Sequence, residues 1–140
     1  MSFNQYFSNE SIQNQLETWA TQYPDILSLN QIGQSHEGKP IWVLTLTNRT
    51  TGTDLSKPAM WIDANIHATE LAGSTTALYI TEQLLSAYGS DEHVTSLLDT
   101  CTLYIVPRVN PDGAALALSD NPHYVRSGVR VYPWEELDEG

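Results

Sequence analysis

The chain has 140 residues, of which 41% are hydrophobic, and its four tryptophans and seven tyrosines are typical of one folded domain rather than of a disordered segment. A formal net charge of −11, with only six scattered Lys and Arg residues, argues against nucleic acid as a partner, because binding to a phosphate backbone needs clustered cations. No apolar stretch approaches the ~20 residues that a membrane-spanning helix requires, so no membrane association is expected.

The first predicted element is an amphipathic helix over residues 8–22. Its apolar residues recur at helical spacing, Ser8 or Asn9 is available as N-cap, and Pro24 ends the run. Residues 1–10 show neither the basic start nor the apolar core of a signal peptide, so we expect a cytoplasmic protein.

A β-hairpin is predicted next. Residues 26–32 and 41–47 are rich in apolar and β-branched side chains, and they flank a turn-forming segment at 33–40. The polar residues 48–57 predict a surface loop after the hairpin, and residues 58–63 predict the following strand.

A strand–helix–strand unit is predicted for the centre of the chain. The helix extends from Glu70 to a C-terminal cap at Gly89, and a short helix capped by Ser90 or Asp91 follows it through Leu98. The short helix is expected to contribute three core residues, which are Val94, Leu97 and Leu98. Residues 101–106 form the second strand, so the order predicts a parallel pair with a right-handed crossover and a ligand site at the carboxyl ends of the strands.

The strongest functional signal lies where the first of these two strands ends. Residues 61–70 read Trp-Ile-Asp-Ala-Asn-Ile-His-Ala-Thr-Glu, so a strand-like run breaks into a loop that carries His67 and Glu70. Imidazole and carboxylate are both good zinc ligands, and catalytic zinc is commonly held by two histidines and one glutamate, with water in the fourth position. Spacing alone instead favours a surface histidine and a glutamate in the first turn of a helix, where its charge suits the helix dipole.

A second motif, Pro-Arg-Val-Asn-Pro-Asp-Gly at residues 107–113, follows the later strand, and Asn-Pro and Asp-Gly predict a turn there. Beyond it only a helical turn at 114–119 is predicted. Together the two motifs resemble the zinc carboxypeptidases of the carboxypeptidase A type, over nearly the whole chain. The resemblance implies an α/β fold with a mixed β-sheet and helices on both faces, carboxypeptidase-like and phosphorylase/hydrolase-like. Residues 1–140 would be the N-terminal part of the catalytic domain, incomplete at the C-terminus.

The resemblance also implies the site residues. His67 and Glu70 become ligands of Zn2+, and Arg126, within Tyr-Val-Arg-Ser at 124–127, becomes the arginine that stabilises the oxyanion, with Arg130 as its competitor. Asp63 and Asn65 would help to orient the ligands, whereas residues 110–113 would shape the rim of the site. Three further histidines are expected to have no metal role: His36, His93 and His123.

In this family the third ligand is a histidine and the general base is a glutamate, and both are expected beyond Gly140. The implied reaction is hydrolysis at the C-terminus of a peptide or protein, and the 140-residue chain alone is expected to be inactive. Two alternatives stay open: a non-catalytic remnant that uses the fold for peptide binding or assembly, and a related zinc amidohydrolase or deacylase. The Asn-Pro-Asp-Gly motif and the following Arg-Ser segment favour a peptidase over the deacylase.

Overall fold

The structure is a computed structural model that describes residues 2–122 and 124–128. Its four strands form one sheet in the order β1-β2-β4-β3. The elements in chain order are α1 (Asn9–Gln22), β1 (Leu27–Gln34), β2 (Pro40–Leu46), the short 3-10 helix η1 (Asp54–Ser56), β3 (Ala59–Asp63), α2 (Leu71–Ala87), α3 (Glu92–Thr100), β4 (Thr102–Val106) and α4 (Pro111–Ala117).

The first half of the chain forms the elements that its sequence predicts. The Ser8 side chain caps α1 by accepting a hydrogen bond from the backbone N–H of Ser11, at 3.1 Å. Strands β1 and β2 pair antiparallel as a hairpin, with a shift of register between Gln31 and Gly33. The predicted helix N-cap and the predicted hairpin are therefore both confirmed.

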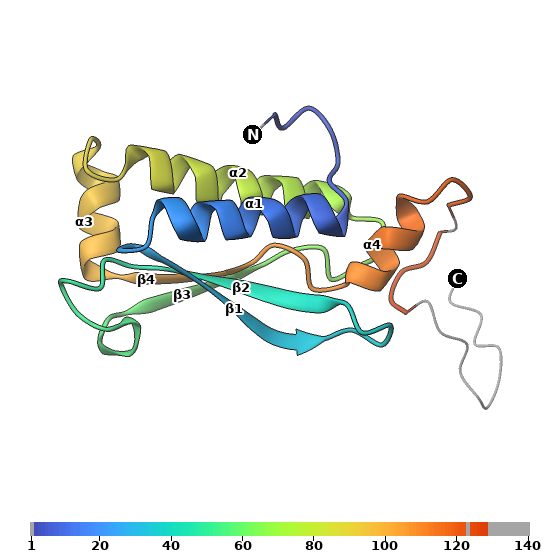
Figure 1. Ribbon diagram of the computed structural model, residues 1–140, viewed down its shortest axis with the longest axis horizontal. Coiled ribbons are helices and arrows are strands. Elements are labelled where there is room, and N and C mark those ends of the chain that lie inside the picture. The colour runs from blue at the N-terminus through green and yellow to red at the C-terminus, as the bar shows by residue number, and fades with distance from the viewer. Residues whose placement is uncertain (1, 123, 129–140) are drawn as a thin grey trace.

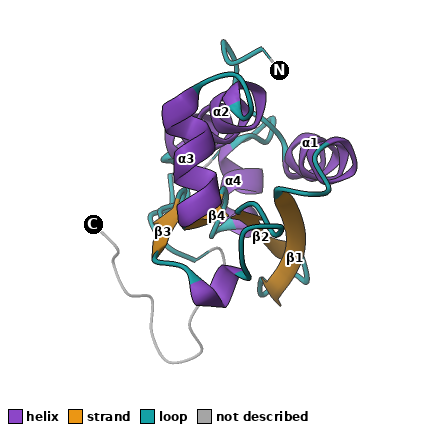
Figure 2. Ribbon diagram, turned by 90° about the vertical axis from the view of Figure 1, so that its left-hand side faces the viewer, coloured by secondary structure: helices purple, strands orange, loops and turns teal. Residues whose placement is uncertain are grey.

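The sheet is mixed, as the sequence predicts. Strand β4 pairs antiparallel with β2 and parallel with β3, so the two strands of the strand–helix–strand unit lie side by side in the same direction. Helices α1 to α4 cover one face of the sheet (Figures 1 and 2). The resemblance implied helices on both faces; in the described part of the chain the other face is contacted by the short helix η1 rather than by an α-helix. The other face carries Tyr104, whose hydroxyl donates to Asp54 of η1 at 2.9 Å, so the loop between β2 and β3 contacts that face.

The hydrophobic core lies between the sheet and the helices. Alternate residues of β4, Leu103 and Ile105, point into it and are at most 5% exposed. Their fully or nearly fully buried partners come from α1, α2, α3 and the hairpin and include Leu16, Trp19, Leu44, Leu46, Leu78, Leu85 and Leu98. This packing fixes the relative positions of the two strand ends at which the sequence motifs lie.

Two local predictions differ from the structure. In α3 only Leu98 is buried, because the helix packs across one end of the sheet and leaves Val94 and Leu97 partly exposed. Helix α4 begins at Pro111 rather than at Ala114, with Asn110 as its N-cap. The predicted Asn-Pro-Asp-Gly turn is thus the start of a helix, since Asn is a preferred N-cap and proline has the φ angle that the first helical position needs.

Candidate functional site

The loop between β3 and α2, residues 64–70, lies at the carboxyl end of the parallel pair, and we call it the His-Glu loop. Asn65 reverses the chain there with a φ of 55°, a left-handed conformation that asparagine adopts more readily than most residues. Its side-chain amide donates to the carbonyl oxygens of His67, at 2.8 Å, and Ala68, at 3.2 Å. Asn65 therefore orients the backbone on which the candidate ligands are carried.

The structure brings His67 and Glu70 together. His67 Nδ1 lies 2.9 Å from Glu70 Oε1, and the two side chains are 33% and 60% exposed. Glu70 occupies the N-cap position of α2, but its side chain makes no capping hydrogen bond in the described structure. Both side chains line a cavity of about 440 Å³ between β3 and α2, together with Ile62, Asp63, Ala64, Asn65, Ile66, Gly73, Thr76, Ala77 and Ile80.

This pair fits a zinc ion in its chemistry. It offers one imidazole nitrogen and one carboxylate oxygen to the same cavity, and these are two of the three protein ligands that a catalytic zinc site uses. Within residues 2–122 and 124–128, no group of three or more His, Cys, Asp or Glu side chains is placed to hold a metal. Zinc ligation by His67 and Glu70, the two candidate ligands among the described residues, therefore stays a prediction.

The N-terminus of α4 packs directly against the His-Glu loop. The backbone N–H of Asn110 donates to the carbonyl of Asn65 at 3.0 Å, and its side-chain oxygen accepts from the N–H of Gly113 at 2.9 Å. A Cβ atom on Gly113 would lie only 2.4 Å from Cβ of Ala68, which is fully buried. Glycine is thus required at the closest approach between α4 and the loop.

Residues 124–128, which we call the Arg126 segment, lie beside the same loop and bind to it through their backbone. The N–H of Ala68 donates to the Arg126 carbonyl at 2.8 Å, and the Asn110 side chain donates to the carbonyl of Ser127. The Arg126 side chain is exposed, and its role as oxyanion donor stays a prediction. Its competitor Arg130 lies outside the described residues.

The other residues singled out from the sequence occupy different settings. Asp63 accepts a hydrogen bond from the indole N–H of Trp61 at 2.8 Å, so its partner is a neighbour on β3 rather than a candidate ligand. His36 and His93 are exposed. His123 lies outside the described residues.

Asp112 is a buried carboxylate whose function the sequence did not reveal. It accepts hydrogen bonds from Ser35 Oγ at 2.8 Å, from Lys39 Nζ at 2.9 Å and from the backbone N–H of Glu37 at 3.1 Å. Burial acts to raise the pKa of Asp112, but these three donors and the Lys39 charge outweigh it and hold the pKa below its ordinary value. Asp112 thereby fastens the start of α4 to the hairpin turn.

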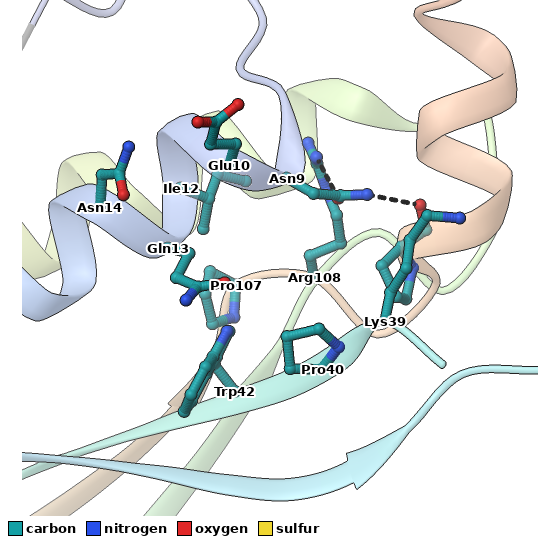
Figure 3. A pocket seen from close by; sticks show the side chains of 11 residues that line it. Asn9, Glu10, Ile12, Gln13, Asn14, Lys39, Pro40, Trp42, Pro107 and Arg108 are labelled. Carbon is teal, nitrogen blue, oxygen red and sulfur yellow. Dashed lines mark hydrogen bonds between the residues drawn. The ribbon is translucent and has the colours of Figure 1, made fainter. Parts of the chain in front are cut away.

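Arg108 is a second buried charged residue that the sequence did not single out. Its guanidinium donates to Asn9 at 2.9 Å and to Ser74 at 3.2 Å, linking α1 to α2, and it is only 5% exposed. Burial lowers the pKa of Arg108 to about 10. It lies on the wall of a separate cavity of about 460 Å³ between α1 and the sheet, near Trp42 and Lys39 (Figure 3). Among the described residues no carboxylate pairs with it, and its Nη2 is buried without a hydrogen-bond partner.

Comparison with known proteins places this arrangement in a family. The family model described as zinc carboxypeptidase matches residues 12–129. Carboxypeptidase A2 of Mus musculus is 37% identical over 120 residues, which is 86% of this chain and 28% of that protein. Carboxypeptidase A1 of Sus scrofa is 33% identical over 116 residues, or 83% of this chain and 27% of that protein.

A solved structure supports the same grouping. The crystal structure of thrombin activatable fibrinolysis inhibitor superposes with a TM-score of 0.84 and 29% sequence identity, covering 96% of this chain and 33% of that chain. The chain therefore spans 28% and 27% of the length of these two carboxypeptidases and 33% of the length of the solved chain.

Proposed function

This chain belongs to the zinc carboxypeptidase family, and we propose that its His67 and Glu70 are zinc ligands of a metallocarboxypeptidase that hydrolyses C-terminal peptide bonds. The observation that carries this proposal is the approach of His67 Nδ1 to Glu70 Oε1, at 2.9 Å, on a loop at the carboxyl end of a parallel strand pair. Ligand sites of α/β sheets occur at this end of the strands.

The proposal divides the chemistry between this chain and residues outside it. When bound, zinc acts as a Lewis acid, which lowers the pKa of a coordinated water and polarises the scissile carbonyl. His67 and Glu70 hold the ion, and the Arg126 guanidinium donates hydrogen bonds to the oxygen that gains negative charge. The third protein ligand and the general base are proposed to come from polypeptide outside the 140 residues. The substrate is a peptide or protein C-terminus.

The surroundings of the pair support this assignment. The backbone of the Arg126 segment is hydrogen-bonded to the His-Glu loop, so metal ligands and a cation that can stabilise an anion share one neighbourhood. The cavity beside the pair is lined largely by apolar groups, among them Ile62, Ala77 and Ile80. Apolar surroundings strengthen the interaction between a fixed charge and a developing charge.

We also propose that the protein is cytoplasmic, as expected from its sequence.

Calorimetric zinc titration of the 140-residue chain tests the ligand assignment. We expect weak binding, because two protein ligands are present where catalytic sites use three. His67→Ala or Glu70→Gln should weaken it by more than about tenfold, since loss of even an outer hydrogen-bond partner costs that much in zinc sites. His93→Ala, on the exposed surface of α3, is the matched control. Unchanged zinc affinity in both ligand variants would show that the metal binds elsewhere.

An activity assay separates the proposal from its alternatives. A chromogenic dipeptide with a free C-terminal carboxylate is compared with its blocked counterpart, and the 140-residue chain should hydrolyse neither appreciably. Strong hydrolysis of the free acid would show that the third ligand and the base lie within these 140 residues. Failure of zinc binding together with retained peptide binding would favour the non-catalytic alternative. Preference for small acyl-amino acids, once zinc and the missing residues are supplied, would favour the deacylase.

A further inference from the structure

Asn110 forms hydrogen bonds with both its backbone and its side chain, and these bonds join three segments of the chain. Its backbone N–H donates to Asn65 and its side-chain oxygen caps α4 by accepting from Gly113, at 3.0 and 2.9 Å. Its side-chain nitrogen donates to Ile66 O of the His-Glu loop, at 3.3 Å, and to Ser127 O. One amide side chain therefore contacts the helix, the ligand-bearing loop and the segment that carries Arg126.

The Arg126 segment is an exposed stretch of irregular chain. Residues 124 and 126–128 are exposed, and the segment belongs to no helix or strand. The backbone hydrogen bond that joins it to the His-Glu loop runs from Ala68 N–H to Arg126 O, at 2.8 Å. The Asn110 bond to Ser127 is formed at the next carbonyl along the chain. These two adjacent bonds tie the Arg126 backbone to the part of the fold that carries His67 and Glu70.

We propose that Asn110 is a positioning residue, whose side-chain amide holds the Arg126 segment against the His-Glu loop so that the arginine reaches the reacting carbonyl. The inference rests on the proposed function for the role of Arg126, but the docking of the segment is a property of the chain itself. The oxygen and the nitrogen of the amide have different tasks. The oxygen caps α4, while the nitrogen binds the two carbonyls, and only the second task is the proposed one.

Asn110→Asp separates the two tasks. Aspartate is as good an N-cap as asparagine, so α4 keeps its cap, but a carboxylate cannot donate to Ile66 O or Ser127 O. Asn110→Ala removes both tasks. Asn14→Asp, at an exposed position on α1, is the matched control for the change in charge.

Limited trypsin digestion of the 140-residue chain is the first readout. Trypsin does not cleave after a lysine that is followed by proline, as Lys39 and Lys57 are. Arg108 is buried and therefore protected from cleavage. Cleavage after exposed Arg49 then serves as the internal reference for cleavage after Arg126, and mass spectrometry separates fragments that end at Arg126 from those that end at Arg130. Asn110→Asp should speed cleavage after Arg126 by roughly three- to tenfold, the effect of one lost hydrogen bond, and leave Arg49 unchanged.

Hydrogen exchange of two amides in the His-Glu loop is the second readout. Protection of the Ala68 N–H, which donates to Arg126 O, should fall in Asn110→Asp, whereas the Ala64 N–H, which donates to Val106 O at 3.0 Å, should stay protected. Wild-type cleavage and exchange in Asn110→Asp would overturn the proposal. An equal rise at Arg49 and Arg126 would also overturn it, because Asn110 would then stabilise the whole fold. Neither readout needs zinc or activity, so the result stands apart from that of the zinc titration.

Discussion

The two ends of the parallel pair β3 and β4 are built on different principles. At the amino ends, polar side chains bind one another: Lys57 Nζ donates to the side chains of Thr47, at 2.8 Å, and Thr51, at 2.9 Å. Asp99 accepts from Asn48 and from Tyr88, each at 2.8 Å, and these hydrogen bonds hold the pKa of its carboxyl below the ordinary value. Lys57 and Asp99 thus each form side-chain hydrogen bonds within the fold.

At the carboxyl ends, polar side chains such as Asp112 and Asn110 also stabilise the fold, and the His-Glu loop lies beside them. The side chains that carry the candidate chemistry are partly or largely exposed there: His67 and Glu70 contact each other, and Arg126 is exposed. The comparison teaches that polar side chains stabilise the fold at both ends, whereas the carboxyl end also holds a loop whose candidate functional groups stay accessible to solvent. Four predictions can break or sharpen this contrast.

The largest effect is expected from Arg126→Ala, measured in a longer protein that contains the third ligand and the general base. Turnover should fall by about 100- to 1000-fold, with a much smaller change in substrate binding, because an oxyanion donor acts chiefly in the transition state. Steady-state kinetics with zinc content checked provides the measurement, and Arg130→Ala should be milder. Exchange of the two results would move the oxyanion role to Arg130; normal turnover in both would remove it from this segment.

Gly113→Ala should produce the next largest effect. The new Cβ would lie 2.4 Å from Ala68 Cβ and 3.0 Å from Ala68 Cα, and atoms so close to the backbone cannot rotate away. We expect a loss of about 3 kcal/mol in the free energy of unfolding, at the upper end for overpacking. Gly33→Ala is the control, since nothing lies within 4 Å of its added Cβ. Equal denaturation midpoints for the two variants would mean that α4 and the His-Glu loop can separate freely.

Asp112→Asn should destabilise the protein by about 2 kcal/mol near neutral pH, because three donors bind the charged carboxylate. The folded-state pKa of Asp112 is lowered, so its contribution is present above the unfolded-state pKa of ~3.9 and is lost as the pH falls through the folded-state value. The stability difference between wild type and variant should therefore be constant from about pH 6 to 8 and shrink below about pH 4. A difference that grows toward acid pH would contradict this sign.

The smallest effect on stability is expected at the functional end. His67→Ala should change the free energy of unfolding by no more than about 0.5 kcal/mol while weakening zinc binding, since the side chain is partly exposed and packs little. Lys57→Met should do the reverse, costing about 1 kcal/mol without changing zinc affinity. Urea denaturation and zinc titration of both variants test the pair. A Lys57 variant that loses zinc, or a His67 variant that unfolds easily, would erase the contrast between the two ends.

The amino-acid sequence by itself determined the elements and the family. Short-range periodicity predicts α1, the hairpin and the β3–α2–β4 unit, because the spacing of apolar residues directly reflects the geometry of helices and strands. The two loop motifs indicate the zinc carboxypeptidase family, which the comparisons confirm. The proximity of His67 and Glu70 also follows locally, since they are only three positions apart in the sequence.

Only the tertiary structure decided how these parts are held together. Lys39 and Asp112 are 73 positions apart, Arg108 and Asn9 are 99 apart, and Asn110 reaches Ile66 across 44. No periodic pattern encodes such contacts, because they depend on which segments the folded core brings side by side. The same reason explains why Asn110-Pro111-Asp112-Gly113 resembles a simple turn in sequence. In the fold it is the start of a helix: Asn110 and Gly113 lie against the His-Glu loop, and the Asp112 carboxylate binds the hairpin turn.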